Sequence, residues 1–228
     1  MSDQLEIELK FEILDKTGFL NFIKNLEQTS DKTVTDTYFD TSDCQLFQRG
    51  IFIRVRNHKR LDFKFNPTVL QNPNTYDDHS SSDEYNFDLP MKANDLSRLN
   101  SVLKILNLKE INKPTIEELK KQNNFQDSIN LNKVRREYKL DKFTLVFDSI
   151  DELGEILEIE YIGKGEEIEE IKKEMLDILK PLSLKLLTVG NNELYWRKNN
   201  FDLYLKGRFL LQEDYAKYRP EVLKSKQD

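Results

Sequence analysis

Residues Leu5–Glu12 read LEIELKFE, an unbroken alternation of apolar and charged side chains. Because successive side chains of a strand point to opposite faces of a sheet, this stretch predicts a strand with one apolar and one charged face. The charged face carries Glu6, Glu8, Lys10 and Glu12. A single strand of this kind is most simply an amphipathic surface strand with its charges in water. The same pattern on later strands, with a consistent choice of charge, favours a more specific arrangement.

Similar alternation predicts further strands along the chain, at residues 33–40, 51–56, 61–65, 84–89, 132–140, 143–148 and 156–161. Helical spacing of apolar residues predicts helices at 15–28, 94–106, 114–122 and 166–180, with Asp15 or Thr17 and Asn94 as caps and Pro114 in a first turn. Residues 66–83 predict a long loop. About eight strands in antiparallel meanders indicate an α+β fold with a closed sheet rather than a βαβ wind.

The composition limits the classes of function. The formal net charge of -6 argues against a protein that binds duplex nucleic acid, because phosphate backbones demand a basic surface. The single Cys44 excludes an intramolecular disulfide and a cysteine metal cluster. We see no membrane-spanning run and no signal peptide, so we expect a soluble, cytoplasmic protein that is a monomer or homodimer.

The strands can be placed in two ways, and the helices decide between them. If the apolar faces met inside a barrel, the apolar stripes of the helices would have nothing to cover. If the apolar faces look outward, the helices can cover them and the charged faces line a water-filled tunnel. We prefer the second arrangement because it uses every apolar stripe.

The charges that would line such a tunnel fall into two groups. The bases are Lys10, Arg54, Arg56, Lys64 and Arg135, with Lys133 and Lys139 as further candidates; the acids are Glu6, Glu8, Glu158 and Glu160, with Asp148 nearby. Carboxylates brought together need a cation, and Mg²⁺ or Mn²⁺ with oxygen ligands would neutralise them. Arginine forks and lysine charges suit phosphate oxygens. The combination predicts a site for a metal and a polyphosphate.

Six ordered motifs strengthen this interpretation. They are the E-x-E-x-K ending at Lys10, DTYFDT at 36–41, R-x-R at 54–56, DFK ending at Lys64, K-x-R at 133–135 and LGEILEIE ending at Glu160. Together they resemble the CYTH domain, the triphosphate tunnel family of thiamine triphosphatases, inorganic triphosphatases and class IV adenylyl cyclases. The match covers roughly residues 1–190, and residues 191–228 predict one or two helices packed on the same domain as a C-terminal extension.

The resemblance implies an eight-stranded antiparallel barrel with helices outside, and it implies roles for single residues. Glu6, Glu8, Asp148, Glu158 and Glu160 would hold the divalent metal. Lys10, Arg54, Arg56, Lys64, Arg135 and Lys185 would bind the triphosphate, and Lys10, Glu6 and Glu8 would be the catalytic groups. Lys185 has an equally good interpretation as a surface lysine. The family's arginine and glutamate after the variable loop, and its late serine-tyrosine, have no clear counterpart here.

The expected activity is metal-dependent hydrolysis of a triphosphate, with release of the terminal phosphate. The general base stays open between a lysine of lowered pKa and a metal-bound hydroxide. One alternative is cyclisation of ATP, against which stands the absence of a histidine-phenylalanine pair before Glu6; Phe52 keeps an organic substrate possible because it could stack on a ring. The other is a non-catalytic sensor of polyphosphate or nucleotide. We expect Glu158→Gln to abolish turnover and to leave the fold intact.

Overall fold

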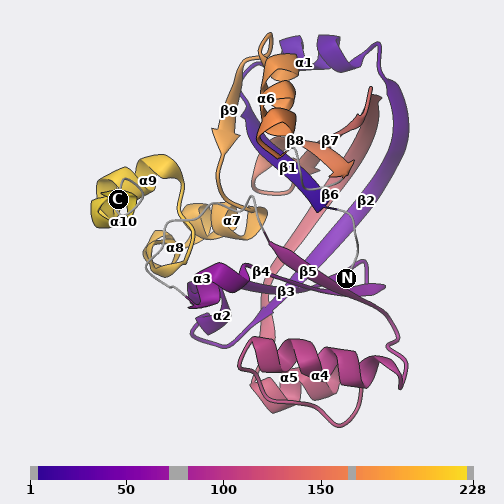
Figure 1. The fold of residues 1–228 in the computed structure, drawn as a ribbon, viewed down its shortest axis with the longest axis vertical. Helices are drawn as coiled ribbons and strands as arrows, with labels where there is room; N and C mark the ends of the chain where they lie inside the picture. The colour runs from indigo at the N-terminus through magenta and orange to yellow at the C-terminus, as the bar shows by residue number, and fades with distance from the viewer. Residues whose placement is uncertain (1–4, 72–81, 164–167, 225–228) are drawn as a thin grey trace. The chain divides into compact units, whose positions relative to one another are not determined.

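The computed structural model describes residues 5–71, 82–163 and 168–224. Its strands are β1 (Leu5–Ile13), β2 (Glu27–Asp40), β3 (Ile51–Arg56), β4 (Arg60–Phe65), β5 (Asp83–Asp88), β6 (Gln126–Leu140), β7 (Phe143–Ile150), β8 (Gly154–Gly163) and β9 (Leu184–Leu187). Its helices are α1 (Lys16–Ile23), α2 (Gln45–Arg49), α3 (Pro67–Gln71), α4 (Asp95–Ile105), α5 (Ile116–Asn123), α6 (Ile168–Leu179), α7 (Asn191–Asn199), α8 (Phe201–Lys206), α9 (Gln212–Tyr218) and α10 (Pro220–Lys224). Figure 1 labels them on the ribbon.

The described strands form one sheet in the order β5-β4-β3-β2-β6-β7-β8-β1-β9. The pairs β1–β8, β3–β4 and β7–β8 are antiparallel, which confirms the predicted α+β class with an antiparallel sheet and surrounding helices. The sheet has nine strands where about eight were expected, because the short β9 pairs with residues Lys10–Ile13 of β1. The predicted closure of the sheet into an eight-stranded barrel is wrong for the described residues, because β5 and β9 are the two edges of this order and are not hydrogen-bonded neighbours.

The chain forms two compact units. The first holds described residues 5–34, 132–163 and 168–195, and the second holds 35–71, 82–131 and 196–224. In the first unit, α1 and α6 cover the apolar face of β1, β7 and β8 (Figure 1). Ile7, Phe11, Leu157 and Met175 are buried there. The expectation that helices cover the apolar strand faces is therefore confirmed in this unit.

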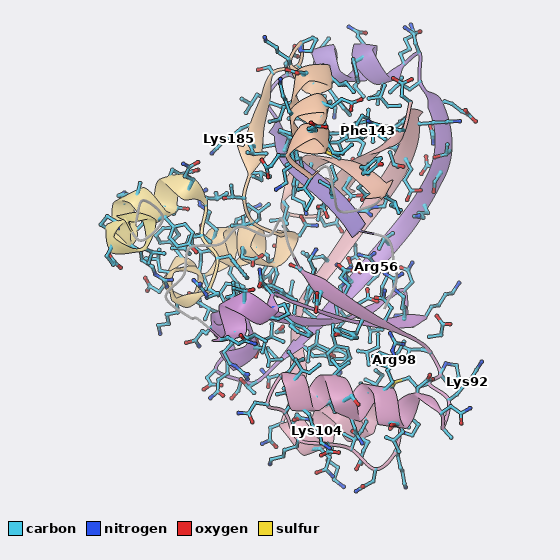
Figure 2. The ribbon with its side chains drawn as sticks, viewed as in Figure 1. Arg56, Lys92, Arg98, Lys104, Phe143 and Lys185 are labelled. Carbon is cyan, nitrogen blue, oxygen red and sulfur yellow. The ribbon has the colours of Figure 1, made fainter. Side chains whose placement is uncertain are left out.

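The second unit repeats the arrangement with other elements. Ile53, Phe63 and Phe87, from β3, β4 and β5, are buried against Leu99 and Leu103 of α4. Arg98 of α4 places its guanidinium over the Phe87 ring, 4.6 Å from the centroid (Figure 2). In this unit also, the apolar side of the strands is covered and the charged residues of β3 and β4 occupy the other side.

Several predicted element boundaries are wrong for local reasons. The first helix ends at Ile23, and the chain enters β2 at Glu27, where β-branched residues from Thr29 to Thr37 favour a strand. Asp15 caps α1 as predicted, since its carboxylate accepts from the Gly18 N–H at 3.1 Å. Asn94 makes no side-chain cap.

Other differences concern short helices. The five residues of α2 lack helical periodicity, and the Asp40 carboxylate holds their first turn by accepting from the N–H groups of Leu46 and Phe47, each at 2.9 Å. Part of the predicted 66–83 loop is α3, and residues 72–81 lie outside the described part, as does the predicted start of α6. The helix predicted from Pro114 begins at Ile116, with Thr115 as its cap.

The C-terminal stretch forms α7 to α10, where one or two helices were expected. In the second unit Tyr204, Leu210 and Tyr215 make their own buried cluster. The Phe209 ring lies 6.3 Å from that of Phe52 on β3. The predicted boundary between residues 190 and 191 stays a prediction.

Candidate functional site

On the polar face of the first unit, β1 and β8 bring predicted site residues directly opposite one another. Their register pairs Glu8 with Glu160, and Lys10 with Glu158. Lys10 Nζ lies 2.8 Å from Glu158 Oε1 and 3.2 Å from Glu8 Oε1. The Glu8 side chain is 28% exposed, whereas that of Glu158 is 5% exposed. Glu8 is therefore the more accessible of the two carboxylates that Lys10 contacts.

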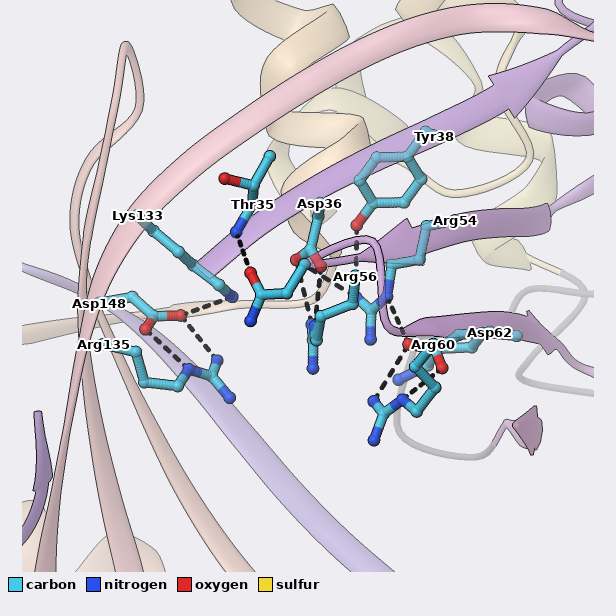
Figure 3. A network of polar contacts seen from close by, with 12 residues as sticks. Thr35, Asp36, Tyr38, Arg54, Arg56, Arg60, Asp62, Lys133, Arg135 and Asp148 are labelled. Atoms are coloured by element: carbon cyan, nitrogen blue, oxygen red, sulfur yellow. Dashed lines mark hydrogen bonds and ion pairs between the residues drawn. The ribbon is translucent and has the colours of Figure 1, made fainter. Parts of the chain in front are cut away.

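The neighbouring strands β6 and β7 add a second group of charges to this face. Arg135 makes a two-pronged contact with Asp148, with Nε to Oδ1 at 2.8 Å and Nη2 to Oδ2 at 2.7 Å (Figure 3). The same Nη2 donates to Glu158 Oε2 at 2.7 Å. Lys133 Nζ donates to Asp148 Oδ2 at 2.9 Å. Both oxygens of Asp148, which is fully buried, are thus engaged by cations.

These contacts shift the pKa values of Glu158 and Lys10. Burial alone would raise the pKa of Glu158, but Lys10, Arg135 and Lys133 outweigh burial and hold it well below its usual range. Burial would lower the pKa of Lys10, but Glu158 and Glu8 outweigh that effect and raise it. Lys10 therefore keeps its proton at neutral pH. This arrangement speaks against the alternative of Lys10 as a general base of lowered pKa.

In the second unit, two arginines of β3 each contact a buried carboxylate. Arg56 makes a fork with Asp36 of β2, with Nε to Oδ1 at 2.7 Å and Nη2 to Oδ2 at 3.0 Å. Arg54 Nε donates to Asp62 Oδ2 at 3.1 Å, and its Nη1 donates to the Tyr38 hydroxyl at 3.4 Å (Figure 3). Burial opposes the charge of Arg54, but Tyr38 and the nearby carboxylates raise its pKa well above the ordinary value.

The order of exposure on this face favours binding of an anion. The Arg54 and Arg56 side chains are 18% and 20% exposed, while those of Asp36 and Asp62 are each 2% exposed. The cations therefore stand nearer to solvent than the carboxylates that hold them. Lys64, the next predicted base, is half-buried and lies 3.3 Å from Glu84 Oε1 of β5.

Two further predicted site residues lie on β9 and β1. Lys185 lies on β9 (Figure 2), and its register partner is Glu12, so it belongs to the polar face of β1. Glu6 lies on β1 opposite Ile162, and its side chain is outside the described part of the structure. Arg136 forms an ion pair with Asp31 at 3.2 Å, away from its neighbour Arg135, as strand alternation requires.

Sequence reasoning assigned no role to several charged or polar residues of these faces. They are Asp36, Tyr38, Arg60, Asp62 and Glu84. The sequence contained a signal for them. Arg60 and Asp62 share a strand face with Lys64 because they are spaced two residues apart, and Asp36 shares a face with Tyr38 for the same reason. Residues that share a strand face with a predicted binding group are candidates for the same site.

The donor chemistry of the first unit fits a hard divalent cation. Within residues 5–71, 82–163 and 168–224, no three His, Cys, Asp or Glu side chains gather as a metal-binding group. Mg²⁺ in nucleotide and phosphate sites commonly uses only one or two carboxylates and completes its shell with waters and phosphate oxygens. Glu8 and Glu160, directly opposite and half-buried, supply two such carboxylates. Asp148 and Glu158 are more buried, and each of them contacts two cations.

Known proteins provide an independent comparison. A protein-family model described as CYTH domain matches residues 4–189. No curated protein matches the chain.

Within the described residues, none of the helices combines the length and apolar character needed to cross a membrane.

Solved structures share the fold. A protein of Pyrococcus horikoshii is 19% identical with a TM-score of 0.57, over 85% of this chain and 99% of that one. A Hippeastrum protein, described as a candidate adenylyl cyclase with a dominant triphosphatase activity, is 16% identical with a TM-score of 0.57, over 85% and 96%. A candidate adenylate cyclase from Vibrio parahaemolyticus is 16% identical with a TM-score of 0.53, over 85% and 99%. At these identities the likeness concerns the fold alone.

Proposed function

This chain belongs to the CYTH domain family, and we propose that it is a divalent-metal-dependent hydrolase of a triphosphate that releases the terminal phosphate. The family contains triphosphatases and cyclases, and its enzymes typically depend on a divalent metal. The observation that carries the proposal is the order of exposure on the polar faces. In the second unit, Arg54 and Arg56 are more exposed than the carboxylates that they contact. In the first unit, Glu8 is more exposed than Glu158.

The first unit would hold the metal, Mg²⁺ or Mn²⁺. Glu8 and Glu160 would be ligands, and Glu6, two residues before Glu8 in the sequence, remains a proposed further ligand. The bound metal would supply positive charge to the phosphate oxygens. Lys10 keeps its proton, and it would neutralise charge on the phosphate chain while restraining Glu8 and Glu158. Asp148 and Glu158 would orient Arg135 towards the substrate rather than contact the metal directly.

The second unit carries side chains that are suited to phosphate oxygens. Arg54, Arg56 and Lys64 supply guanidinium and ammonium donors, and the carboxylates beneath them restrain the side chains before substrate arrives. Lys185 remains a proposed further substrate contact. Catalysis would then rest on positioning and charge stabilisation, because phosphoryl transfer needs little covalent chemistry from the protein.

The packing of Phe52 favours a compact substrate. Its side chain is on the same strand face as Arg54, where it could have stacked on an organic ring. The ring is instead buried and lies 6.3 Å from the Phe209 ring. We therefore rank inorganic tripolyphosphate ahead of thiamine triphosphate and nucleoside triphosphates as substrate.

The test is phosphate release from tripolyphosphate, thiamine triphosphate and ATP, each with Mg²⁺, with Mn²⁺ and with excess chelator. A cyclic AMP assay runs on the ATP samples. The proposal expects metal-dependent phosphate release that is lost in Glu8→Gln. Glu174→Gln is the matched control, since Glu174 is an exposed carboxylate of the same unit, paired with Lys142 on the protein surface.

Three outcomes would overturn the proposal. Formation of cyclic AMP without phosphate release would identify a cyclase. Binding of the triphosphates without turnover of any of them would identify a sensor. Equal loss of activity in Glu8→Gln and Glu174→Gln would remove the assignment of Glu8 as a metal ligand.

A further inference from the structure

One carboxylate in the second unit joins two arginines. Asp62 Oδ1 accepts from Arg60 Nε at 2.6 Å, and Asp62 Oδ2 accepts from Arg60 Nη2 and from Arg54 Nε, each at 3.1 Å. Both guanidinium groups are therefore held by the same side chain (Figure 3). Arg54 and Asp62 are also direct register partners on β3 and β4.

The position of Asp62 makes a purely structural role a poor explanation. Its neighbours Leu61 and Phe63 point to the opposite, apolar face of β4, so Asp62 lies on the polar face, yet its side chain is only 2% exposed. A carboxylate taken out of water is costly, and buried ion pairs can often be replaced by apolar residues without loss of stability. The charge is better explained by what it does to Arg54 and Arg60.

We propose that Asp62 is a positioning residue, which fixes the guanidinium groups of Arg54 and Arg60 for contact with the phosphate chain. This inference rests on the proposed function. Arginine side chains lose substantial rotamer freedom when a ligand orders them, and a fixed carboxylate removes part of that cost beforehand. Asp62 takes the Nε edge of Arg54, while the Nη1 edge makes a long bond of 3.4 Å to Tyr38. A phosphate oxygen can compete with a bond of that length.

The experiment has two readouts in Asp62→Asn, a nearly isosteric change. The first is the arginine Nε–H region of an NMR spectrum of the ¹⁵N-labelled protein, recorded without substrate. The second is calorimetric binding of inorganic tripolyphosphate. The expected result is loss of the restrained Arg54 and Arg60 Nε–H signals and about tenfold weaker binding. Asp127→Asn is the control, because Asp127 is an exposed carboxylate of the same unit, and its Oδ1 lies 2.6 Å from Lys120 Nζ, outside the Arg54–Asp62–Arg60 contacts.

Two further variants separate positioning from folding. In Arg60→Gln the Arg54 signal should persist, since Asp62 still holds Arg54. In Arg54→Ala the additional Asp62→Asn change should weaken binding by less than tenfold, because one of its two targets is gone. If Asp62→Asn fails to fold, Asp62→Glu keeps the charge but displaces it by one methylene, and the same two readouts apply.

The outcomes distinguish this inference from the proposed function. Unchanged Arg54 and Arg60 signals in Asp62→Asn overturn the positioning role, whether or not the protein binds tripolyphosphate. Unchanged binding despite altered signals overturns its importance for the substrate. If the wild-type protein binds no tripolyphosphate, thiamine triphosphate or ATP, the proposed function fails, and the positioning role for phosphate fails with it while the spectra still report the arginine geometry.

Discussion

Glu158→Gln should destabilise the protein as well as impair turnover. The Glu158 side chain is buried, and its carboxylate contacts Lys10 at 2.8 Å and Arg135 at 2.7 Å. Removing one partner of a buried ion pair typically costs about 3–5 kcal/mol, because a charge is left uncompensated. Here Lys10 retains Glu8, and Arg135 retains Asp148. We therefore expect the lower end of that range, about 3 kcal/mol.

Glu8→Gln is the comparison, since it removes the same charge from the same cluster. Glu8 is more exposed and contacts Lys10 at 3.2 Å, so its loss should change the free energy of unfolding by less than about 1 kcal/mol. Metal-dependent turnover should nevertheless be lost in Glu8→Gln. The two variants would thus have different effects on stability and similar effects on activity.

The assay is urea unfolding followed by circular dichroism at pH 7, alongside phosphate release from tripolyphosphate. Glu158→Gln with the unfolding free energy of the wild-type protein would refute the reasoning. In that case the ion pairs of Glu158 contribute nothing, and the sequence-based expectation of an intact fold would stand. A comparable loss of stability in Glu8→Gln would also refute it, because exposure would then not separate the two carboxylates.

Other predictions concern the pH dependence of stability, substrate binding and the capping of α2. Because the pKa of Glu158 is lower in the folded protein than its unfolded-state value of about 4.3, this group stabilises the fold at pH values above about 4.3. The stabilisation is lost as the pH falls from that value through the folded-state pKa. Glu158→Gln should therefore flatten the acid limb of a plot of unfolding free energy against pH. The raised pKa of Lys10 acts in the opposite direction, and its contribution is lost only above about pH 10.4, so the two groups leave a flat region between. Arg135→Gln should raise KM for the triphosphate by about tenfold or more, whereas Arg136→Gln, the neighbour on the opposite face, should leave it unchanged in steady-state kinetics. Asp40→Ala should cost about 2 kcal/mol in urea unfolding, because two buried N–H groups of α2 lose their acceptor; a loss below about 0.5 kcal/mol would contradict the capping role.

The faces of the strands were predictable because side-chain alternation is a local property. Knowing that residues 5–12 form a strand is enough to place Glu8 and Lys10 on one side and Ile7 on the other. The covering of the apolar faces followed from the helical stripes. Both predictions depend on residues close in sequence, and both are confirmed by the buried clusters of the two units.

The partners of the charges were not predictable in the same way. The contacts of Asp148 with Lys133 and Arg135 depend on the register between β6 and β7. Side-chain alternation does not determine that register. For the same reason the fork between Arg135 and Asp148 was not foreseen, and Asp62 received no role. The helix α2 was missed because five residues are too short to display a period, and its first turn is held by Asp40 from the preceding strand.

The acids of these faces therefore divide into two kinds by burial and partner. Asp36, Asp62 and Asp148 are buried and accept forks from arginines, so their charge is used within the protein. Glu8 and Glu160 are half-buried and directly opposite each other on β1 and β8. Like charges in opposite positions of a sheet are unfavourable unless a cation neutralises them. Lys10 neutralises part of this charge through Glu8, and a divalent ion would neutralise more, so the demand for a metal should rest on Glu8 and Glu160 far more than on Asp148.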